Sequence, residues 1–165
     1  PGWLLEEVCA RNARFTLVHA DAMPKVAIGP IAVRRLGPTL WRLEADLRND
    51  GIMDSRTALA ERTRVIPPDE VVCAGSEGAG AVRVLWAAIA RDPLAPRYEP
   101  VERRPERVPL PTLRGRSALR AAWLVEGPEG ARVRITLRSP KGGLARSGLV
   151  LHETAGPSDN EQRGR

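Results

Sequence analysis

The stretch that most constrains the fold of this chain is residues 41–51, with the sequence WRLEADLRNDG. Its odd-numbered positions from Trp41 to Leu47 are apolar, and its even-numbered positions from Arg42 to Arg48 are charged. Because successive side chains of a strand point to opposite faces, this pattern predicts a strand with one buried face. Asn49-Asp50-Gly51 follows, and these residue types favour a turn or bulge at the end of the strand.

Composition favours short strands joined by turns over a helical bundle, since the chain has 15 glycines, 15 prolines and only 4% aromatic residues. A strand over residues 25–35, with a bulge or edge position at Gly29-Pro30, is predicted to form a hairpin with the 41–48 strand. Residues 117–125 and 131–137 both alternate, and they are predicted to pair as a second hairpin. Residues 52–66 fit a strand slightly better than a helix. Further strands are predicted at 71–74, 81–86 and 144–152.

These segments amount to about seven strands, with turns at the spacing typical of an antiparallel β-sandwich of the immunoglobulin or fibronectin kind. The predicted fold class is therefore mainly β, preceded by one N-terminal helix. Trp41, Trp86 and Trp123 fall on apolar strand faces, so they are predicted to pack between the two sheets.

The chain divides into three parts by pattern. Residues 1–23 read as an amphipathic helix, whose apolar stripe needs cover and is interpreted as leaving an upstream domain. Residues 24–153 form the predicted sandwich, interrupted by a proline-rich segment at 90–112 that reads as an inserted surface loop, with polyproline recognition as the rarer alternative. Residues 154–165 are predicted to be disordered. The stripe residues are Leu4, Leu5, Val8, Phe15 and Val18.

The formal charge of +6 is carried almost wholly by arginine. The arginines are interleaved with acidic residues and not with aromatic ones, which argues against a nucleic-acid partner. Nothing resembles a membrane span of about 18 apolar residues. A basic stripe for phosphate or polysaccharide would form if two strands shared a sheet; the alternative is an ordinary solvent face, partly neutralised by Glu44 and Asp46. The candidate stripe consists of Arg42, Arg48, Arg132, Arg134 and Arg138.

Catalytic and metal-binding residues are not predicted within this chain. His19 and His152 are the only histidines, so a zinc site would have to bring together both, or one with carboxylates. No nucleophile-elbow motif accompanies either histidine, and the glycine-rich segments 75–80 and 141–143 lack nucleotide-binding spacing.

Two smaller groups have ordinary structural readings. Asn49, Asp50 and Asp54 could supply oxygen ligands to calcium, but a turn is the favoured reading. Cys9 and Cys73 are too few for a disulfide framework or a metal knuckle, so each is predicted to be a small buried apolar residue.

Three stretches resemble the C-terminal β-sandwich region that follows the catalytic domain in bacterial zinc carboxypeptidases of the M14 (carboxypeptidase A-like) family. They are LLEEVCARNARFTLVHADAMPKVAI, RRLGPTLWRLEADLRNDGIMDSRTA and LRGRSALRAAWLVEGPEGARVRITLRSPKGGLARSGLVL. In such relatives an Asn-x-Gly turn precedes a Leu-Pro-Thr-like step. Residues 49–51 keep that turn, whereas residues 52–55 depart from the step.

The resemblance implies that the whole protein is a secreted or cell-envelope metallocarboxypeptidase, with zinc held by a catalytic domain upstream of this chain. The His-x-x-Glu pair of such peptidases does not occur here, so no catalytic residue is carried over. We therefore expect a non-catalytic accessory domain that packs on, stabilises or positions the peptidase domain. The alternative is a module that binds cell-wall or other extracellular anionic polymer through its arginines. A small free-standing hydrolase is a third reading, which the shortage of histidines opposes.

Overall fold

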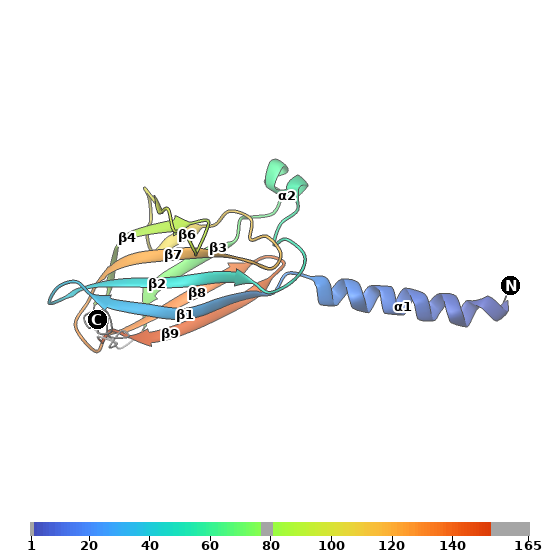
Figure 1. Ribbon diagram of the computed structural model, residues 1–165, viewed down its shortest axis with the longest axis horizontal. Coiled ribbons are helices and arrows are strands. Elements are labelled where there is room, and N and C mark those ends of the chain that lie inside the picture. The colour runs from blue at the N-terminus through green and yellow to red at the C-terminus, as the bar shows by residue number, and fades with distance from the viewer. Residues whose placement is uncertain (1, 77–80, 153–165) are drawn as a thin grey trace, which may run out of the picture.

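The computed structural model describes residues 2–76 and 81–152, and it confirms a mainly β sandwich with one N-terminal helix (Figure 1). Within these residues nine strands, rather than about seven, form two antiparallel sheets. The predicted tail at 154–165 and residues 77–80 of the predicted turn lie outside the described residues. The first sheet has the order β1 (Val26–Arg35), β2 (Leu40–Asn49), β7 (Ser117–Glu126), β4 (Arg83–Ala90) and β5 (Glu99–Pro100). The second has the order β6 (Arg107–Pro109), β3 (Glu70–Gly75), β8 (Arg132–Ser139) and β9 (Gly143–Val150).

The apolar face of β2 lies in the core between the sheets, as its alternation predicts. Its four apolar side chains are only 0–2% exposed. They pack with inward residues of β8, including Ile135 and Leu137. Burying a Leu or Val side chain completely contributes about 1.5–3 kcal/mol each, so this layer supplies much of the stability of the domain.

The predicted hairpin between β1 and β2 is confirmed. Its register shifts between Ile28 and Ile31, where Gly29-Pro30 was predicted to form a bulge. β1 is an edge strand of the first sheet. The Val26 amide donates to the Gly142 carbonyl at 3.0 Å, so this edge lies against the hairpin that connects β8 and β9.

The predicted hairpin between residues 117–125 and 131–137 is wrong. Both segments are strands, but β7 pairs with β2 and β4, whereas β8 pairs with β3 and β9. The turn at residues 127–131 therefore carries the chain from one sheet to the other. Alternation fixes which side chains face the core, and both strands obey it, but it does not specify the neighbouring strand.

A short helix, α2 (Ala58–Thr63), occupies the region where a strand was slightly favoured. The Thr57 hydroxyl accepts a hydrogen bond from the Ala60 amide at 3.2 Å, and this is the usual cap of a helix start. Arg64 adopts left-handed backbone with φ 54°, which ends the helix. These local caps outweigh the weak alternation of the segment.

The proline-rich segment 90–112 is only partly the surface loop that its composition predicts. Its first half carries the exposed strand β5 and is mostly exposed, with the buried Ala90 and the half-buried Tyr98 among the exceptions. Its second half carries β6, which pairs with β3. Val108 and Leu110 are then buried in the core, so the end of this segment completes the second sheet.

Trp86 does not lie between the sheets, in contrast to Trp41 and Trp123. The register of β4 on β7 shifts between Val84 and Trp86. Beyond this bulge, Ala87 is paired with the inward-facing Trp123, and Trp86 is paired with Leu124 on the outer face. One extra residue reverses the facing of every later side chain in a strand, and the sequence alone did not indicate this bulge.

Candidate functional site

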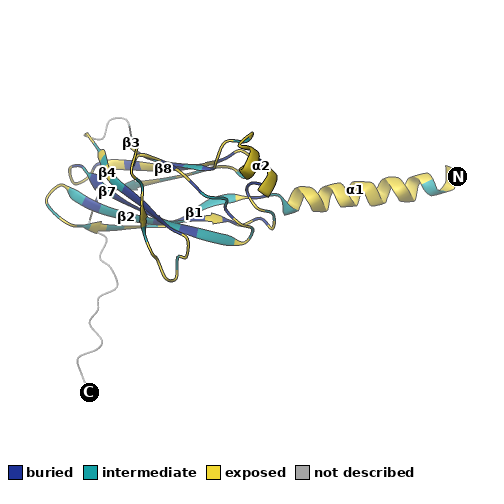
Figure 2. Ribbon diagram, turned by 90° about the horizontal axis from the view of Figure 1, so that it is seen from above, coloured by how far each residue is buried: buried dark blue, intermediate teal, exposed yellow. Residues whose placement is uncertain are grey.

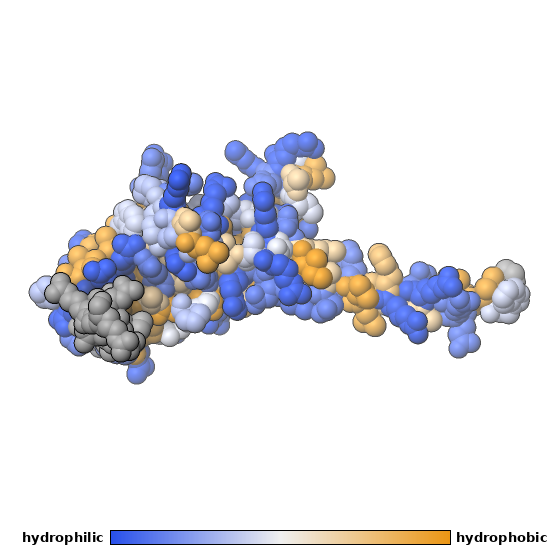
Figure 3. Space-filling model, viewed as in Figure 1, coloured by the Kyte–Doolittle hydropathy of each residue, from blue (hydrophilic) through white to orange (hydrophobic). Residues whose placement is uncertain are grey.

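The N-terminal helix α1 (Leu5–Ala22) projects from one end of the sandwich and extends away from its two sheets (Figure 2). The stripe residues predicted for it are on its surface: Leu5, Val8, Phe15 and Val18 are 48–70% exposed, and Leu4 in the preceding 3₁₀ turn Gly2–Leu4 is half-buried. Figure 3 shows hydrophobic surface along this helix and where it joins the sandwich.

The apolar surface of α1 is not a pure stripe. Leu17 is also exposed, and it lies nine residues from Val8, which is two and a half helical turns and so the opposite side. The Arg11–Glu7 ion pair, at 2.5 Å, lies one turn apart on the helix surface. The helix therefore offers apolar contacts on more than one side, with the main group at the predicted positions.

The C-terminal end of α1 is fixed to the sandwich by backbone hydrogen bonds. The Met53 amide donates to the Ala22 carbonyl at 2.9 Å, and the Asp50 amide donates to the Lys25 carbonyl at 2.8 Å. The last carbonyls of a helix have no hydrogen-bond partner inside the helix. The bond from Met53 supplies such a partner to the Ala22 carbonyl. We call this corner the helix root, comprising residues 22–25, 49–56 and 113–116.

Asn49 is the central side chain of the helix root, and it is 1% exposed. Its Oδ1 accepts from the amides of Lys25 and Gly51, both at 3.0 Å. Its Nδ2 donates to the carbonyls of Met53 and Leu113, at 2.8 and 3.1 Å. The amide group thus uses its full hydrogen-bonding capacity, which ties three separate chain segments together.

Two glycines allow the close approach that these bonds require. A Cβ at Gly51 would lie 2.2 Å from the Met23 carbonyl oxygen, and a Cβ at Gly115 would lie 1.8 Å from the Ile52 carbonyl oxygen. Backbone atoms occupy both positions, so any larger residue would displace the chain. The predicted turn at Asn49-Asp50-Gly51 is confirmed, and its tertiary role is to hold the helix.

The arginines predicted as one stripe lie on different sheets. Arg42 and Arg48 belong to β2, whereas Arg132, Arg134 and Arg138 belong to β8. Since the two strands do not share a sheet, the condition for a single basic stripe is not met. The two groups occupy the outer surfaces of opposite layers.

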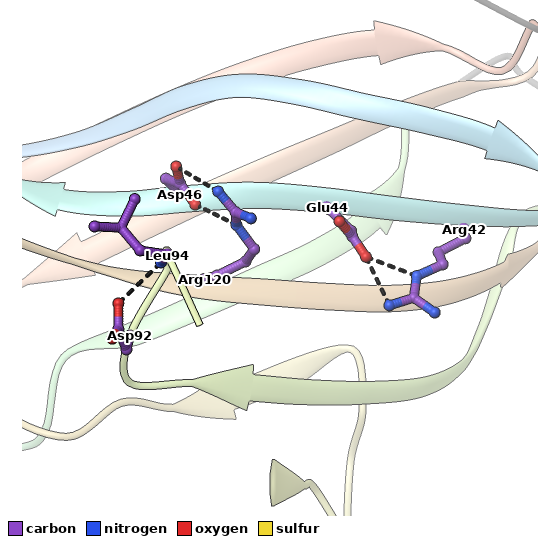
Figure 4. Close-up of polar contacts among 6 residues, drawn as sticks. All are labelled: Arg42, Glu44, Asp46, Asp92, Leu94 and Arg120. Carbon is purple, nitrogen blue, oxygen red and sulfur yellow. Dashed lines mark hydrogen bonds and ion pairs between the residues drawn. The ribbon is translucent and has the colours of Figure 1, made fainter. Parts of the chain in front are cut away.

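On the first sheet the charges are paired (Figure 4). Arg120 binds Asp46 through two hydrogen bonds, at 2.7 and 3.2 Å, and Arg42 contacts Glu44 at 2.6 Å. The Arg42 guanidinium also lies 5.4 Å from the ring centre of Tyr98, and burial raises the pKa of that phenol. Glu44 and Asp46 thus neutralise this face, as the ordinary reading predicted for part of the stripe.

On the second sheet one acidic residue faces several arginines. Arg132, Arg134 and Arg138 form no ion pair with any described residue, and register adds Arg107 and Arg146 to the same face. Glu70 lies opposite Arg138, but its ion pair is with Arg107, at 3.4 Å. We call these five arginines the arginine face. A groove of about 730 Å³ lies at one end of it, lined by Arg132, Arg134 and Ser76.

The candidate metal ligands are not brought together among the described residues. His19 lies on α1 and His152 follows β9 at the opposite end of the molecule, so they cannot share a site (Figure 1). No group of three His, Cys, Asp or Glu side chains suited to a metal ion occurs in the described part of the chain. The Asp54 carboxylate accepts from the Gly115 amide at 2.8 Å, and Asp50 contacts Arg48 at 3.4 Å.

The two cysteines differ, which the sequence did not indicate. Cys73 is buried in β3 as predicted, and burial raises the pKa of its thiol to about 12. Cys9 is exposed on α1, so its predicted burial is wrong within this chain. No helix in the described residues is long and apolar enough to cross a membrane.

Sequence reasoning missed three residues that the fold makes prominent. The sequence pattern predicts a turn at Asn49 and a surface loop around Tyr98, and it gives no prediction for Arg56. For Asn49 the Asn-Asp-Gly signal was present, but the end of the helix that it holds is more than twenty residues away in sequence, so no local motif connects them. Arg56 and Tyr98 carry no sequence signal, because their neighbours come from distant segments.

No curated protein matches this chain. A solved structure with some similarity is the archaellum periplasmic stator protein FlaG from Sulfolobus acidocaldarius, with 10% identity and a TM-score of 0.34, covering 76% of this chain and 99% of that chain. A similarity that low supports no inference about function. A family model described as a domain of unknown function, DUF8731, matches residues 25–149, which comprise the sandwich without α1. The chain therefore belongs to the DUF8731 family.

Proposed function

We propose that this chain is a non-catalytic accessory domain that docks through α1 on another domain of the same protein and holds it in position. The observation that carries the proposal is that α1 exposes Phe15 and Val18 by about 70% while its C-terminal end is fixed to the sandwich. Helices in proteins gain most of their stability by packing an apolar face rather than from intrinsic helix propensity. A covering surface would supply that packing.

The helix root supports a positioning role rather than a loose tether. A flexible linker would leave the two domains free to reorient. Here Asn49 makes four hydrogen bonds, and Gly51 and Gly115 admit backbone atoms that any side chain would displace. A domain packed on α1 would therefore adopt a defined orientation relative to the sandwich.

The nature of the other domain is also part of the proposal. The resemblance of three stretches to the region after the catalytic domain of M14 carboxypeptidases supports a zinc metallocarboxypeptidase as that domain. Zinc and catalysis would then belong to it. The absence of a His-x-x-Glu pair from this sequence is consistent with that division of roles.

Docking is tested in the full-length protein by comparing Val18→Asp with Ala13→Asp. Both substitutions add one carboxylate to an exposed position of α1, but Ala13 lies well away from the side that carries Val8 and Val18. We expect Val18→Asp to lower the melting temperature and to increase amide hydrogen exchange of α1. Equal effects of both substitutions, or fast exchange throughout α1 in the unmodified full-length protein, would contradict docking.

The non-catalytic part of the proposal has a separate test. The 165-residue chain is incubated with a hippuryl-type peptide and zinc, and release of the C-terminal residue is followed. We expect no turnover above the blank. Hydrolysis that a chelator abolishes would show that this chain is itself a metallopeptidase.

A second candidate function is binding of cell-wall or other extracellular anionic polymer, and the arginine face is the specific observation that favours it. Its arginines converge on one sheet surface with Glu70 as the one acidic residue in register among them. Clustered positive charge attracts polyanions, in a manner that salt weakens.

Retention on peptidoglycan and on an acidic polysaccharide tests this candidate. The variant carries Arg132→Glu, Arg134→Glu and Arg138→Glu; the control, with the same change in net charge, carries Arg48→Glu, Arg83→Glu and Arg91→Glu. We expect the variant alone to lose retention. No retention of the unmodified chain, or equal losses in both, removes polymer binding as a function.

A further inference from the structure

A groove of about 410 Å³ lies at the helix root, beside the point where α1 meets the sandwich. Met23, Ile52 and Met53 provide apolar walls, and Arg56, Lys141 and Asp54 provide charged groups. We call it the root groove. It is separate from the arginine face, which lies on the second sheet.

Arg56 is the unusual residue of the root groove. Its side chain is only 9% exposed, and its Nε is buried without a hydrogen-bond partner. No hydrogen bond to any described residue is formed by its guanidinium group. Its one charged contact is Glu61 Oε1 at 3.8 Å, and the Glu61 side chain is 55% exposed.

A buried guanidinium in this state is energetically unfavourable. It carries a permanent charge, and its Nε–H is a buried donor without an acceptor, which forfeits the hydration that this group had in water. Buried polar groups in folded proteins nearly always have partners, so an exception calls for an explanation. An acceptor in the root groove would supply one.

A purely structural role for Arg56 would need a carboxylate within the fold, and the nearby buried candidate is engaged elsewhere. Asp69 is completely buried, and its Oδ2 is hydrogen-bonded to the Ser55 hydroxyl. Asp69 Oδ1 is itself without a hydrogen-bond partner, and the ion pair that Arg56 makes with a described residue is to Glu61 rather than to Asp69. The Ser55 hydroxyl in turn accepts from the Leu113 amide at 2.9 Å, which fixes Asp69 and Ser55 in place.

The chemistry of the groove selects one kind of acceptor. Arg56 and Lys141 are positive, and Asp54 is negative but already accepts from the Gly115 amide. The three charged residues that line the groove sum to about +1, before the exposed Glu61 beside Arg56 is counted, and this sum favours a monoanion over a dianion. A planar carboxylate matches the fork of a guanidinium, and flexible methionines at 23 and 53 suit a short aliphatic chain.

We propose that the root groove binds a carboxylate on a short aliphatic chain, with Arg56 as its anchor and Met23 and Met53 contacting the chain. Two sources share this chemistry: a free small carboxylic acid, or a glutamate side chain of a domain that packs on α1. The first source is independent of the proposed function, whereas the second rests on it.

The test follows the Arg56 Nε–Hε signal by ¹⁵N NMR while sodium butyrate is added to the 165-residue chain, with sodium chloride at equal ionic strength as the reference. We expect a saturable change in the chemical shift of this signal, with a Kd on the order of 1–10 mM. The affinity is weak because butyrate has few non-hydrogen atoms that can contribute to binding. Sodium sulfate is expected to shift the signal less. The signal is assigned by its loss in Arg56→Lys. Arg62→Lys, at an exposed arginine of α2, is the matched control and should leave the butyrate response unchanged.

A shift that is linear in butyrate, or equal in sodium chloride, overturns the proposal. This readout uses the unmodified protein, so it decides the question even if Arg56→Lys does not fold. The same titration in the full-length protein separates the sources. If the signal is already shifted and butyrate no longer moves it, the carboxylate comes from the covering domain; if butyrate still moves it, the ligand is a free acid. Failure of α1 docking would leave the response of the 165-residue chain intact.

Discussion

Helix α1 and strand β2 are both amphipathic in sequence, but the apolar face of β2 is buried and the apolar face of α1 is exposed. The apolar residues of β2 are 0–2% exposed, because the second sheet covers them. The large apolar residues of α1 are 48–70% exposed, because this helix extends away from the two sheets. Both elements are well formed, so the difference lies in what covers them.

The contrast teaches that an amphipathic pattern identifies a face that gains from cover, but not the surface that provides it. For β2 the cover comes from strands distant in the same sequence, such as β8. For α1 we propose that it comes from another domain. The helix root connects the covered strand β2 to the exposed helix α1. Asn49 is the last residue of β2, and its side chain also fixes the end of α1.

The largest contrast is expected in thiol chemistry, because each region carries one cysteine. Thiolate is the reactive form, and burial raises the pKa of Cys73 to about 12 while Cys9 is exposed. Ellman's reagent at pH 8 should modify Cys9 alone, and both thiols after unfolding in guanidinium. Rapid reaction of both thiols in the folded protein would show that the core of the sandwich opens readily.

The same pKa shift has a consequence for stability. The folded thiol pKa of about 12 is above its ordinary value of 9.0, so its contribution is complete below about pH 9 and is lost as pH rises from 9 towards 12. Replacing Cys73 with Ala should flatten the stability curve over that range. A curve of unchanged slope in this variant would assign the alkaline loss of stability to other groups.

Removal of a core side chain is expected to give the largest change in folding free energy. Leu43→Ala in β2 should lower the free energy of unfolding by about 3 kcal/mol, from lost burial and the cavity left behind. The matched control is Val18→Ala on α1, which should change it by less than about 0.5 kcal/mol in this chain. Urea denaturation measures both. Similar losses for the two variants would mean that α1 is covered in solution.

Asn49→Ala should be nearly as damaging, by about 2–3 kcal/mol, because it leaves buried amides and carbonyls without partners. Asp50→Ala is the control, since its contact with Arg48 is on the surface and contributes little. Residual dipolar couplings give a second readout: in Asn49→Ala the orientation of α1 relative to the sandwich should be averaged. An unchanged orientation would refute a positioning role for Asn49.

The smallest difference separates two buried tryptophans. Trp41 Nε1 donates to the Gly127 carbonyl at 3.0 Å, whereas Trp123 Nε1 is buried without a partner. Replacement by phenylalanine removes a hydrogen-bonded donor at Trp41 and a donor without a partner at Trp123. Trp41→Phe should therefore cost about 1 kcal/mol more than Trp123→Phe in the free energy of unfolding. The reverse order would show that the indole of Trp123 has a partner in solution, such as water.

Local patterns predicted much of the sandwich but not its pairing. The face of β2, the hairpin with β1, the bulge at Gly29-Pro30 and the Asn-Asp-Gly turn were all predictable, because each depends on residues close in sequence. The exchange of β7 and β8 between sheets was not predictable in this way. A turn of a few residues can return a strand to its own sheet or carry it across to the other, and alternation is the same in both cases.

The candidate sites were predictable to a similar degree. The stripe of α1 was found from its spacing, because helical periodicity is local. The root groove could not be found, since Met23, Arg56 and Lys141 are far apart in sequence and are brought together by the path of the chain. The outward position of Trp86 was not predictable, because the bulge between Val84 and Trp86, unlike that at Gly29-Pro30, has no glycine or proline to mark it.

The sequence by itself determined which side chains of each strand and of α1 are apolar and so which faces gain from burial, because facing follows from the local period of the backbone. Only the tertiary structure decided where those faces lie. It placed β2 and β8 in different sheets, so the arginines of β2 meet Glu44 and Asp46 while those of β8 share one surface with Glu70 alone in register among them. The physical reason is that strand partners and charge neighbours are set by contacts between distant segments, which no local period encodes.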